Sequence, residues 1–271
     1  MSATPPNPRQ PYPSTYFMQD RSSQDEMTRL AIQDQMLTTG MGGVLPEQPD
    51  PTNFRRVLDI GCGTGGWLIE AAKTYPTMSR LIGIDVNNHM LEYAQAQARA
   101  EQVDARVEFQ AMDALLILNF SQDYFDLVNV RFATSFVRTW EWPKLLTAMQ
   151  NILRPGGVIR LTEYERITSS SPAAVRLFKM AGDAFYKAGY LFAEGKTGDT
   201  FSECTIGVAG DLERLLRQSE VKNVQTRRSI QKPPAGTPGS ESFAEDLRLG
   251  FRTIAPFARK WGCLPDNYEA L

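Results

Sequence analysis

The 271-residue chain contains only three cysteines and one histidine, and both shortages exclude classes of site. Cys62, Cys204 and Cys263 are too few and too scattered for a disulfide framework, and no CxxC pair suggests zinc. The sequence therefore predicts no metal site and a reducing, cytoplasmic location. The single histidine, His89, leaves few side chains that change charge near neutral pH. No apolar run approaches the roughly 18 residues that a membrane-spanning helix needs.

Neither sign of charge is in excess, since 29 Lys and Arg residues stand against 31 Asp and Glu residues. A protein that binds nucleic acid through its phosphates normally carries a basic excess, so we expect no nucleic-acid partner. Hydrophobic residues make up 42% of the chain, which is enough for a large domain with a stable core. The composition indicates a globular protein and leaves its oligomeric state open.

The first fifty residues divide into a tail and a helical segment. Residues 1–14 are rich in proline, which lacks a backbone N–H, so they are predicted to be a disordered tail. Residues 23–38 begin with a capping-box pair and keep the spacing of apolar side chains that is typical of a helix. We assign 15–52 to N-terminal helices and 53–271 to a second, larger domain.

From residue 55 onward, short apolar runs alternate with helical stretches. This alternation predicts an α/β fold with a doubly wound, mostly parallel sheet and helices on both faces. The first five strands are expected at 55–60, 81–85, 106–111, 125–130 and 158–163. Helices are expected at 67–75, 88–98, 144–153, 172–192, 209–218 and from about 242, with a sixth strand at 223–230 and no seventh.

The most informative segment is 55–75, where a strand, a glycine-rich loop and a helix follow one another. Gly61, Gly63 and Gly66 have the spacing G-x-G-x-x-G, and Asp85 lies near the expected distance beyond them. The glycines let the backbone touch a ligand, and an acid at the end of the second strand accepts hydrogen bonds from ribose hydroxyls. The spacing predicts an adenosine-type nucleotide without saying which one; the alternative for Asp85 is a solvated loop acid.

Asp59 discriminates between nucleotides. It stands two residues before Gly61, where a dinucleotide site normally has an apolar side chain beside the pyrophosphate. A carboxylate at that position repels phosphate but suits an ammonium group. A nicotinamide-dependent dehydrogenase is therefore disfavoured, and the alternative for Asp59 is an acid that only caps the following loop.

The string 57–65, VLDIGCGTG, closely resembles the first motif of class I S-adenosylmethionine-dependent methyltransferases. The segments 82–91, 111–114, 125–128 and 153–157 resemble later motifs of that family in the same order. The resemblance implies a Rossmann-like fold with S-adenosylmethionine as cofactor. It also implies roles by position: Asp59 reaches the amino group of the methionine moiety, Gly61 and Gly63 approach it closely, Asp85 binds the ribose, Asp113 binds the adenine amino group, and Val86 and Ala114 flank the ring.

The N-terminal segment also carries a resemblance. Tyr16-Phe17-Met18, followed by Glu26 and Arg29-Leu30, resembles the lid helices of small-molecule methyltransferases related to the ubiquinone and menaquinone C-methyltransferases. It implies that residues 15–52 form a lid in which Tyr16 and Arg29 close over the cofactor carboxylate; the alternative for Arg29 is a solvated helix residue.

Two further residues are predicted from their place on a strand. Asn129 and Arg131 lie at the end of the fourth strand, and ligands bind at the carboxyl ends of strands in such sheets. We therefore expect both to contact the cofactor or the substrate. The sequence 129–132 also departs from the Asn/Asp-Pro-Pro-Tyr motif of enzymes that methylate amino groups of nucleic acids and glutamine.

The stretch inserted after the fifth strand, at about 170–200, is predicted to be a helical cover for the acceptor. Its aromatic and apolar side chains suit an apolar pocket, and the alternative is that they only dock the helix on the sheet. Glu163 and Tyr164, at the end of the fifth strand, are the predicted catalytic groups, whereas motif order places His89 beside the adenosine. The predicted lining residues are Phe178, Phe185, Tyr186, Tyr190, Leu191 and Phe192.

These observations predict methyl transfer to a small, largely apolar metabolite. Two alternatives keep the cofactor but not the transfer. In one, the bound sulfonium acts electrostatically in a rearrangement or cyclisation. In the other, the chain is a regulatory module that uses the cofactor to control a partner protein.

Overall fold

The computed structural model describes residues 24–192, 203–205, 207–219 and 221–268. The predicted tail at 1–14, and Tyr16 and Ser23, lie outside these residues. Within the described part of 15–52 there is one α-helix, α1 (Gln24–Gly40), followed by a single 3-10 turn, η1 (Pro51–Asn53).

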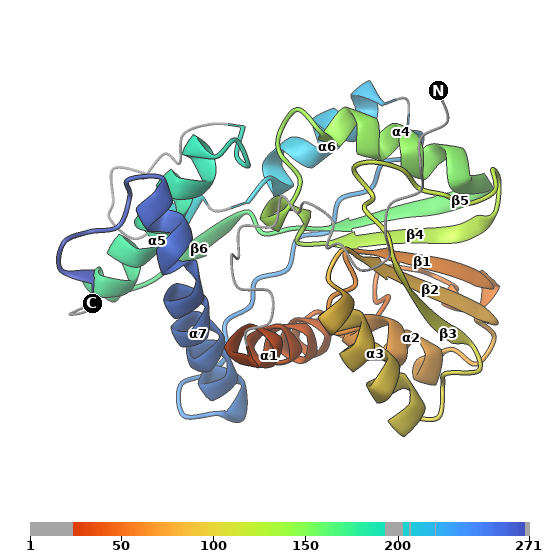
Figure 1. The fold of residues 1–271 in the computed structure, drawn as a ribbon, viewed down its shortest axis with the longest axis horizontal. Helices are drawn as coiled ribbons and strands as arrows, with labels where there is room; N and C mark the ends of the chain where they lie inside the picture. Colours follow the sequence, from red (N-terminus) through yellow and green to blue (C-terminus); the bar gives the residue numbers. More distant parts are fainter. Residues whose placement is uncertain (1–23, 193–202, 206, 220, 269–271) are drawn as a thin grey trace.

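Five parallel strands form the central sheet, in the order β3-β2-β1-β4-β5 (Figure 1). The order reverses between β1 and β4, and open α/β sheets bind their ligands at the carboxyl ends of the strands beside such a reversal. The predicted parallel α/β sheet is confirmed. Its strands are β1 (Arg56–Ile60), β2 (Arg80–Asp85), β3 (Val107–Ala111), β4 (Phe125–Arg131) and β5 (Leu153–Thr162).

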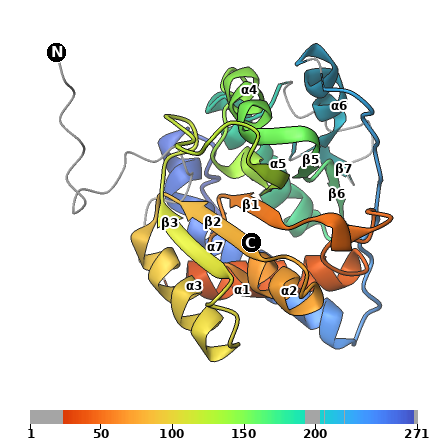
Figure 2. The ribbon, with the colours of Figure 1, turned by 90° about the vertical axis from the view of Figure 1, so that its right-hand side faces the viewer.

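Helices cover both faces of the sheet, which is why β1 and β4 are buried along almost their whole length (Figures 1 and 2). On one face, α2 (Gly66–Thr74) and α3 (Asn88–Ala100) cover a core that contains the fully buried Val57 and Leu127. On the other face, α4 (Trp142–Ile152) and α6 (Ala209–Gln218) pack over Leu58 and Val128. Neighbouring residues of one strand therefore face opposite sides, as the pleat of a strand requires.

The remaining elements form a smaller layer beside the carboxyl edge of the sheet. They are the antiparallel pair β6 (Arg166–Thr168) and β7 (Glu203–Thr205), and the helices α5 (Pro172–Lys187) and α7 (Pro238–Lys260). Both helices begin with proline after a side-chain cap, Ser171 for α5 and Thr237 for α7. α7 packs against both α1 and α5, so the C-terminal helix holds the N-terminal helix in place.

The predicted sixth strand at 223–230 is wrong. The segment has no strand structure, and most of its side chains are exposed. It is rich in polar residues, including Gln225, Thr226, Arg227 and Arg228, so neither face of a strand there would bury apolar surface. One smaller expectation also differs, because β5 begins at Leu153 rather than after the Pro-Gly-Gly sequence at 155–157.

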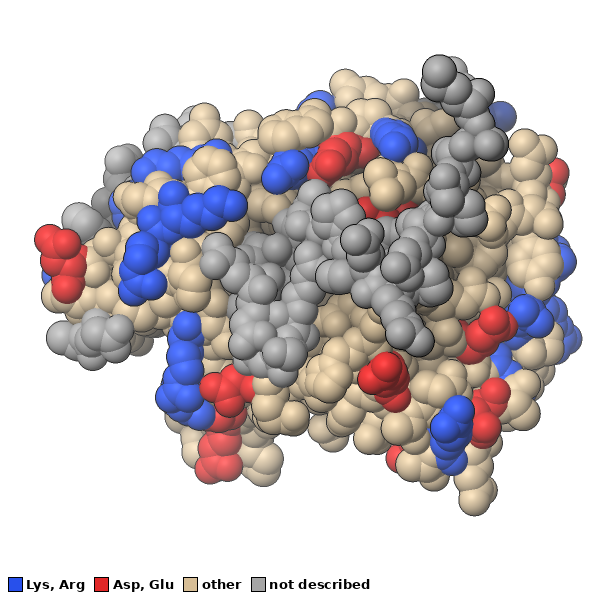
Figure 3. Space-filling view, in the orientation of Figure 1, with Lys and Arg blue, Asp and Glu red and all other residues tan. Residues whose placement is uncertain are grey.

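The charged surface is mixed. On the face in Figure 3, Lys and Arg side chains of the described residues are interspersed with Asp and Glu side chains, without a broad region of one sign. Among the helices that the structure describes, none combines the length and the apolar character needed to cross a bilayer.

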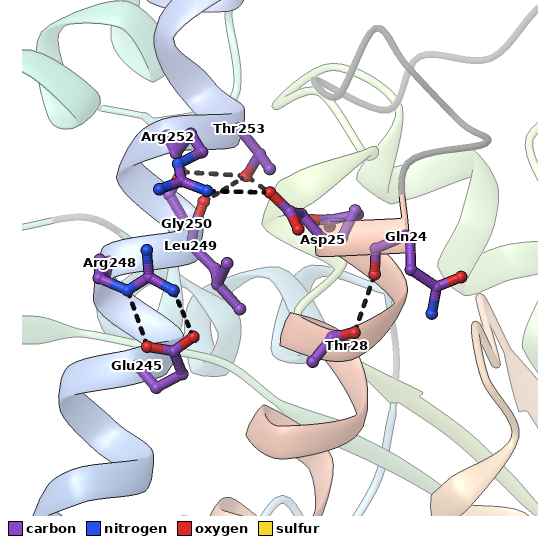
Figure 4. Close-up of polar contacts among 10 residues, drawn as sticks. Gln24, Asp25, Thr28, Glu245, Arg248, Leu249, Gly250, Arg252 and Thr253 are labelled. Atoms are coloured by element: carbon purple, nitrogen blue, oxygen red, sulfur yellow. Dashed lines mark hydrogen bonds and ion pairs between the residues drawn. The ribbon is translucent and has the colours of Figure 1, made fainter.

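Two kinds of ion pair join α1 to α7. Near the start of α1, Asp25 Oδ2 lies 3.2 Å from Arg252 Nη1, and both side chains are about half exposed (Figure 4). One turn further along, the buried Arg29 contacts Glu26 at 2.7 Å and Asp246 of α7 at 3.3 Å. Buried charges are costly unless they are paired, so the second contact dominates the attachment of α1.

The two arginines make a matched test of this attachment. Arg29→Met leaves two carboxylates buried without their cation, so we expect it to lower the unfolding free energy by about 3–5 kcal/mol. Arg252→Met removes an exposed pair, and the expected loss is about 0–1 kcal/mol. Urea unfolding near neutral pH measures both values, and losses of equal size would contradict the assignment.

Candidate active site

The loop that joins β1 to α2 needs glycine for its conformation. Gly61, Gly63 and Gly65 have φ values of 68°, 52° and 74°, in the left-handed region that other residues rarely adopt. A Cβ atom at Gly61 would lie 2.9 Å from the ring of Phe136, whereas one at Gly63 would meet nothing closer than 3.9 Å. The backbone at Gly63 therefore faces open space where a ligand can approach.

A cavity of about 270 Å³ lies against this loop, at the carboxyl ends of β1, β2, β4 and β5 and beneath α1. Nearly all the residues predicted from the sequence line it, although they come from distant parts of the chain. They are Arg29, Asp59, Gly61, Gly63, Asp85, Val86, Asp113, Ala114, Arg131, Glu163 and Tyr164. Among the predicted cofactor-binding and catalytic residues that the structure describes, Asn129 alone is not in the lining.

Backbone N–H groups orient the carboxylates of Asp85, at the carboxyl end of β2, and of Asp113, just after β3. The Asp85 carboxylate accepts hydrogen bonds from the N–H groups of Gly63, at 3.0 Å, and Asn87, at 2.8 Å. The Asp113 carboxylate accepts one from the N–H of Leu115 at 2.9 Å. Asp113 lies in the loop that follows β3, which is paired with β2, so the two acids come from adjacent strand ends and both line the cavity.

Asp59 lies deeper, on the central strand, and only 3% of it is exposed. Its Oδ1 accepts a hydrogen bond of 2.7 Å from Nδ2 of Asn129, which is fully buried behind it. Burial raises the pKa of Asp59 to about 6, although Arg131 and the bond from Asn129 act in the opposite direction. Asn129 therefore reaches the cavity only through Asp59.

The arginines predicted to contact the cofactor already hold α1 in place. Arg131 forms an ion pair with Asp34 and lies 3.4 Å from Thr38 Oγ1, both on α1. Its Nε is buried and has no hydrogen-bond partner among the described residues. Asp34 and Asp246 were not predicted from the sequence; for Asp34, the available signal was its place four residues before Thr38, which puts both on one face of α1.

Glu163 and Tyr164 line the opposite side of the cavity. Both carboxylate oxygens of Glu163 are held by Thr134, its N–H at 3.1 Å and its hydroxyl at 2.7 Å. Burial raises the pKa of Glu163 to about 7, and these hydrogen bonds oppose part of the increase. The Tyr164 ring stacks on the Phe132 ring, with 4.7 Å between the ring centroids, and burial also raises the pKa of the Tyr164 hydroxyl.

Thr134 is a residue that sequence reasoning missed. It lies in the one-turn 3-10 helix η2 (Ala133–Ser135), which follows β4 after Phe132. Phe132 has a φ of 56°, in the left-handed region, and this turn directs the chain back toward the end of β5. No local sequence motif announces such a turn, because the residue in the left-handed conformation is not glycine.

The aromatic side chains of 172–192 do not share one role. Phe185 lines the cavity, together with Phe132 and Phe136 from the loop after β4. Phe178 packs on Phe251 and Tyr190 on Phe257, both of α7. Of the six side chains predicted to line an acceptor pocket, Phe185 alone lines the cavity. Leu191 and Phe192 pack in the core above the sheet, and Tyr186 is 38% exposed.

His89 lies in the first turn of α3, where its side chain is exposed and does not line the cavity. Glu163 lines the cavity, and burial raises its pKa to about 7. A group with that pKa exchanges protons readily at neutral pH.

The hydrogen-bond acceptors of the cavity fit an adenosine-bearing cation. The three carboxylates of Asp59, Asp85 and Asp113 accept hydrogen bonds from ammonium, hydroxyl and amino groups. Val86, Met90 and Met112 supply apolar surface beside them for a planar ring. A pyrophosphate would meet the buried Asp59 carboxylate, so the arrangement disfavours a dinucleotide.

Comparison with known proteins agrees with this geometry. The model of a family described as "Methyltransferase domain" matches residues 57–157. Demethylmenaquinone methyltransferases of Staphylococcus aureus, from strains MRSA252 and JH9, are 27% identical over 180 residues, which cover 64% of this chain and 70% of theirs.

One solved structure gives the same fold. An O-methyltransferase family protein from Burkholderia thailandensis is 16% identical with a TM-score of 0.51, over 78% of this chain and 56% of its own. A methyltransferase from Geobacter sulfurreducens, solved with S-adenosyl-L-homocysteine, is 26% identical with a TM-score of 0.38, over 54% of each chain. The matched region thus spans little more than half the length of these two structures.

Glu163 makes stability depend on pH in one direction. Burial raises the pKa of Glu163 in the folded protein from 4.5 to about 7. Its contribution to the unfolding free energy is therefore complete below pH 4.5 and is lost as the pH rises to about 7. Glu163→Gln removes this titration. Between about pH 4.5 and pH 8, we expect the variant to lose up to about 3 kcal/mol less unfolding free energy than the parent. Urea unfolding at the two pH values measures the difference, and equal losses would contradict the burial of this carboxyl.

Proposed function

We propose that this chain, a class I S-adenosylmethionine-dependent methyltransferase, transfers the methyl group of its cofactor to a small, largely apolar acceptor. The observation that carries the proposal is the division of one cavity into two chemically different sides. Asp59, Asp85 and Asp113 stand on one side, and Glu163 stands with aromatic rings on the other. The relatives named for demethylmenaquinone also favour a small-molecule acceptor.

On the first side, each carboxylate has a separate role toward the cofactor. Asp85, fixed by two backbone N–H groups, accepts hydrogen bonds from the ribose hydroxyls, and Asp113 accepts one from the adenine amino group. Asp59 pairs with the ammonium group. The open backbone at Gly63 allows close approach, and Gly61, Val86 and Ala114 complete the wall.

Arginine side chains above the sheet complete the cofactor side. Arg29 and Arg131 both line the cavity, and we assign them to the cofactor carboxylate, with Tyr16 as a further group from the N-terminal segment. The buried Nε of Arg131, which lacks a partner among the described residues, supplies a donor for this purpose. Because Arg131 also pairs with Asp34, the same side chain connects the cofactor side to α1.

When bound, S-adenosylmethionine supplies an activated methyl group on a sulfonium whose charge disperses as the methyl leaves. On the acceptor side, Glu163 accepts a proton from the acceptor, a task that suits a carboxyl with a pKa of about 7. Phe132, Phe136 and Phe185 exclude water from the reacting groups, and Tyr164 orients the acceptor through its hydroxyl.

We place this reaction in the cytoplasm. Cys62 and Cys263 are free thiols, which suits a reducing compartment. The reaction itself is tested by incubating the protein with isotopically labelled S-adenosylmethionine and cell extract. A product heavier by one labelled methyl group supports transfer, whereas a converted acceptor of unchanged mass supports a rearrangement.

Asp85 tests the cofactor side. Asp85→Ala removes two charge-assisted hydrogen bonds of roughly 1.5–3 kcal/mol each, so the Kd for S-adenosylhomocysteine should rise at least about a hundredfold. Asp104→Ala, at an exposed acid outside the cavity, should leave the Kd unchanged. Isothermal titration calorimetry measures both, and parental affinity in Asp85→Ala would refute the site.

Glu163 tests the acceptor side. Glu163→Gln should lower kcat by about 10²–10⁴-fold, as loss of a proton acceptor typically does, with cofactor affinity unchanged. His89→Ala is the control, because His89 is exposed and outside the cavity; it should retain at least about a tenth of the parental kcat. The reverse pattern, with His89→Ala inactive and Glu163→Gln active, would show that the proton leaves by another route.

A further inference from the structure

A row of polar side chains crosses the centre of the sheet beneath the cavity. Asp59 of β1 is in register with Asn129 of β4, and Asn129 is in register with Arg160 of β5. Residues in register on parallel strands point to the same face, here the face covered by α2. The row is therefore set by the pairing of the strands.

Hydrogen bonds join the row in one direction. Arg160 Nη1 donates to Asn129 Oδ1 at 3.0 Å, and Asn129 Nδ2 donates to Asp59 Oδ1 at 2.7 Å. The amide of Asn129 accepts on one side and donates on the other, so its orientation is fixed by both neighbours. Behind Arg160, Glu47 receives Nε at 2.8 Å and Nη2 at 3.5 Å.

Burying these polar side chains would destabilise the fold if they did not form hydrogen bonds and ion pairs with one another. Asp59, Asn129 and Arg160 are exposed by 3%, 0% and 7%, in an otherwise apolar layer. A buried charge or amide without a partner is strongly unfavourable. Glu47, whose side chain is 24% exposed, neutralises Arg160 and connects the row to the segment between α1 and β1.

We propose that Glu47, Arg160 and Asn129 form a positioning chain that orients the Asp59 carboxylate toward the cavity and keeps it ionised. The inference rests on the proposed role of Asp59 toward the ammonium group of the cofactor. Glu47, Asn129 and Arg160 do not line the cavity themselves, so they act through Asp59.

The charges around Asp59 determine how each variant should behave. Arg131 of β4 and Arg160 of β5 favour the ionised form, as does the hydrogen bond from Asn129. Asp34 of α1 disfavours it, and burial is the largest effect, which leaves the pKa of Asp59 at about 6. Cys62 and Asp85 also lie close by, and burial raises the pKa of the Cys62 thiol well above its ordinary value, so this thiol stays neutral.

Binding of a cationic cofactor should therefore weaken as Asp59 becomes protonated. In the parent, the affinity for S-adenosylhomocysteine, which retains the ammonium group, should be constant above about pH 7 and fall below about pH 6. Asp59→Asn should remove this pH dependence and bind at the level of the protonated parent.

Substitutions in the positioning chain should shift the midpoint of this pH dependence, and the direction depends on the residue that is changed. Asn129→Leu and Arg160→Met remove groups that favour the ionised carboxylate, so the midpoint should rise by about one pH unit. At pH 6 these two variants should bind S-adenosylhomocysteine about fivefold more weakly than the parent, and near pH 8.5 they should bind it equally well. Arg160→Lys keeps a positive charge, so its shift should be smaller. Glu47→Gln removes the carboxylate that neutralises Arg160, so its midpoint should move below that of the parent.

Calorimetric titration with S-adenosylhomocysteine from about pH 5.5 to pH 8.5 measures these midpoints, with Arg80→Met, at an exposed arginine on β2, as the control. Loss of affinity by the same factor at every pH, or an unmoved midpoint in Asn129→Leu, overturns the proposal. Glu47 is partly exposed, so Glu47→Gln keeps the test available if Asn129→Leu does not fold; an upward shift in that variant also overturns it. A parent that binds no S-adenosylhomocysteine at any pH instead refutes the proposed function.

Discussion

The buried carboxylate of Asp59 is the constraint from which the arrangement of the site follows. It stands at the end of the central strand, where the sheet order reverses, and it must be stabilised without water. Asn129 meets it from the next strand, and Arg131 compensates its charge from the end of the same strand. Because Arg131 pairs with Asp34, the position of α1 over the sheet is tied to the same charge.

The second consequence is a separation of charge within one cavity. The cofactor side holds three acids whose orientations are fixed by backbone N–H groups or by Asn129. The acceptor side holds Glu163 among aromatic rings, and burial keeps its pKa near 7 rather than near 4.5. The carboxyl groups on the two sides of this cavity therefore take different roles because their surroundings differ. An acid kept ionised binds a cation, and an acid poised near neutrality exchanges a proton.

Local patterns predicted the parts of the molecule that depend on neighbouring residues. Alternating strands and helices predicted β1 to β5. Motif spacing predicted Asp85 at the site and the family resemblance predicted Asp113 there, and both line the same cavity. Contacts between distant segments were not predictable in this way. Arg29 and Asp246 pair across most of the length of the sequence. The hydrogen bonds from Thr134 to Glu163 depend on a left-handed turn at Phe132. The segment 223–230 was misread because its few apolar residues suggested a strand, whereas its polar residues leave neither face to bury.

In the proposed function, one cavity presents the cofactor to Glu163. A crystal structure of the protein with S-adenosylhomocysteine tests this arrangement most directly. The account predicts adenosine between Asp85 and Asp113, the ammonium group at Asp59, and the sulfur atom facing the side of the cavity where Glu163 and Tyr164 lie. A complex in which the ligand lies elsewhere, or in which the sulfur faces away from Glu163, would contradict it.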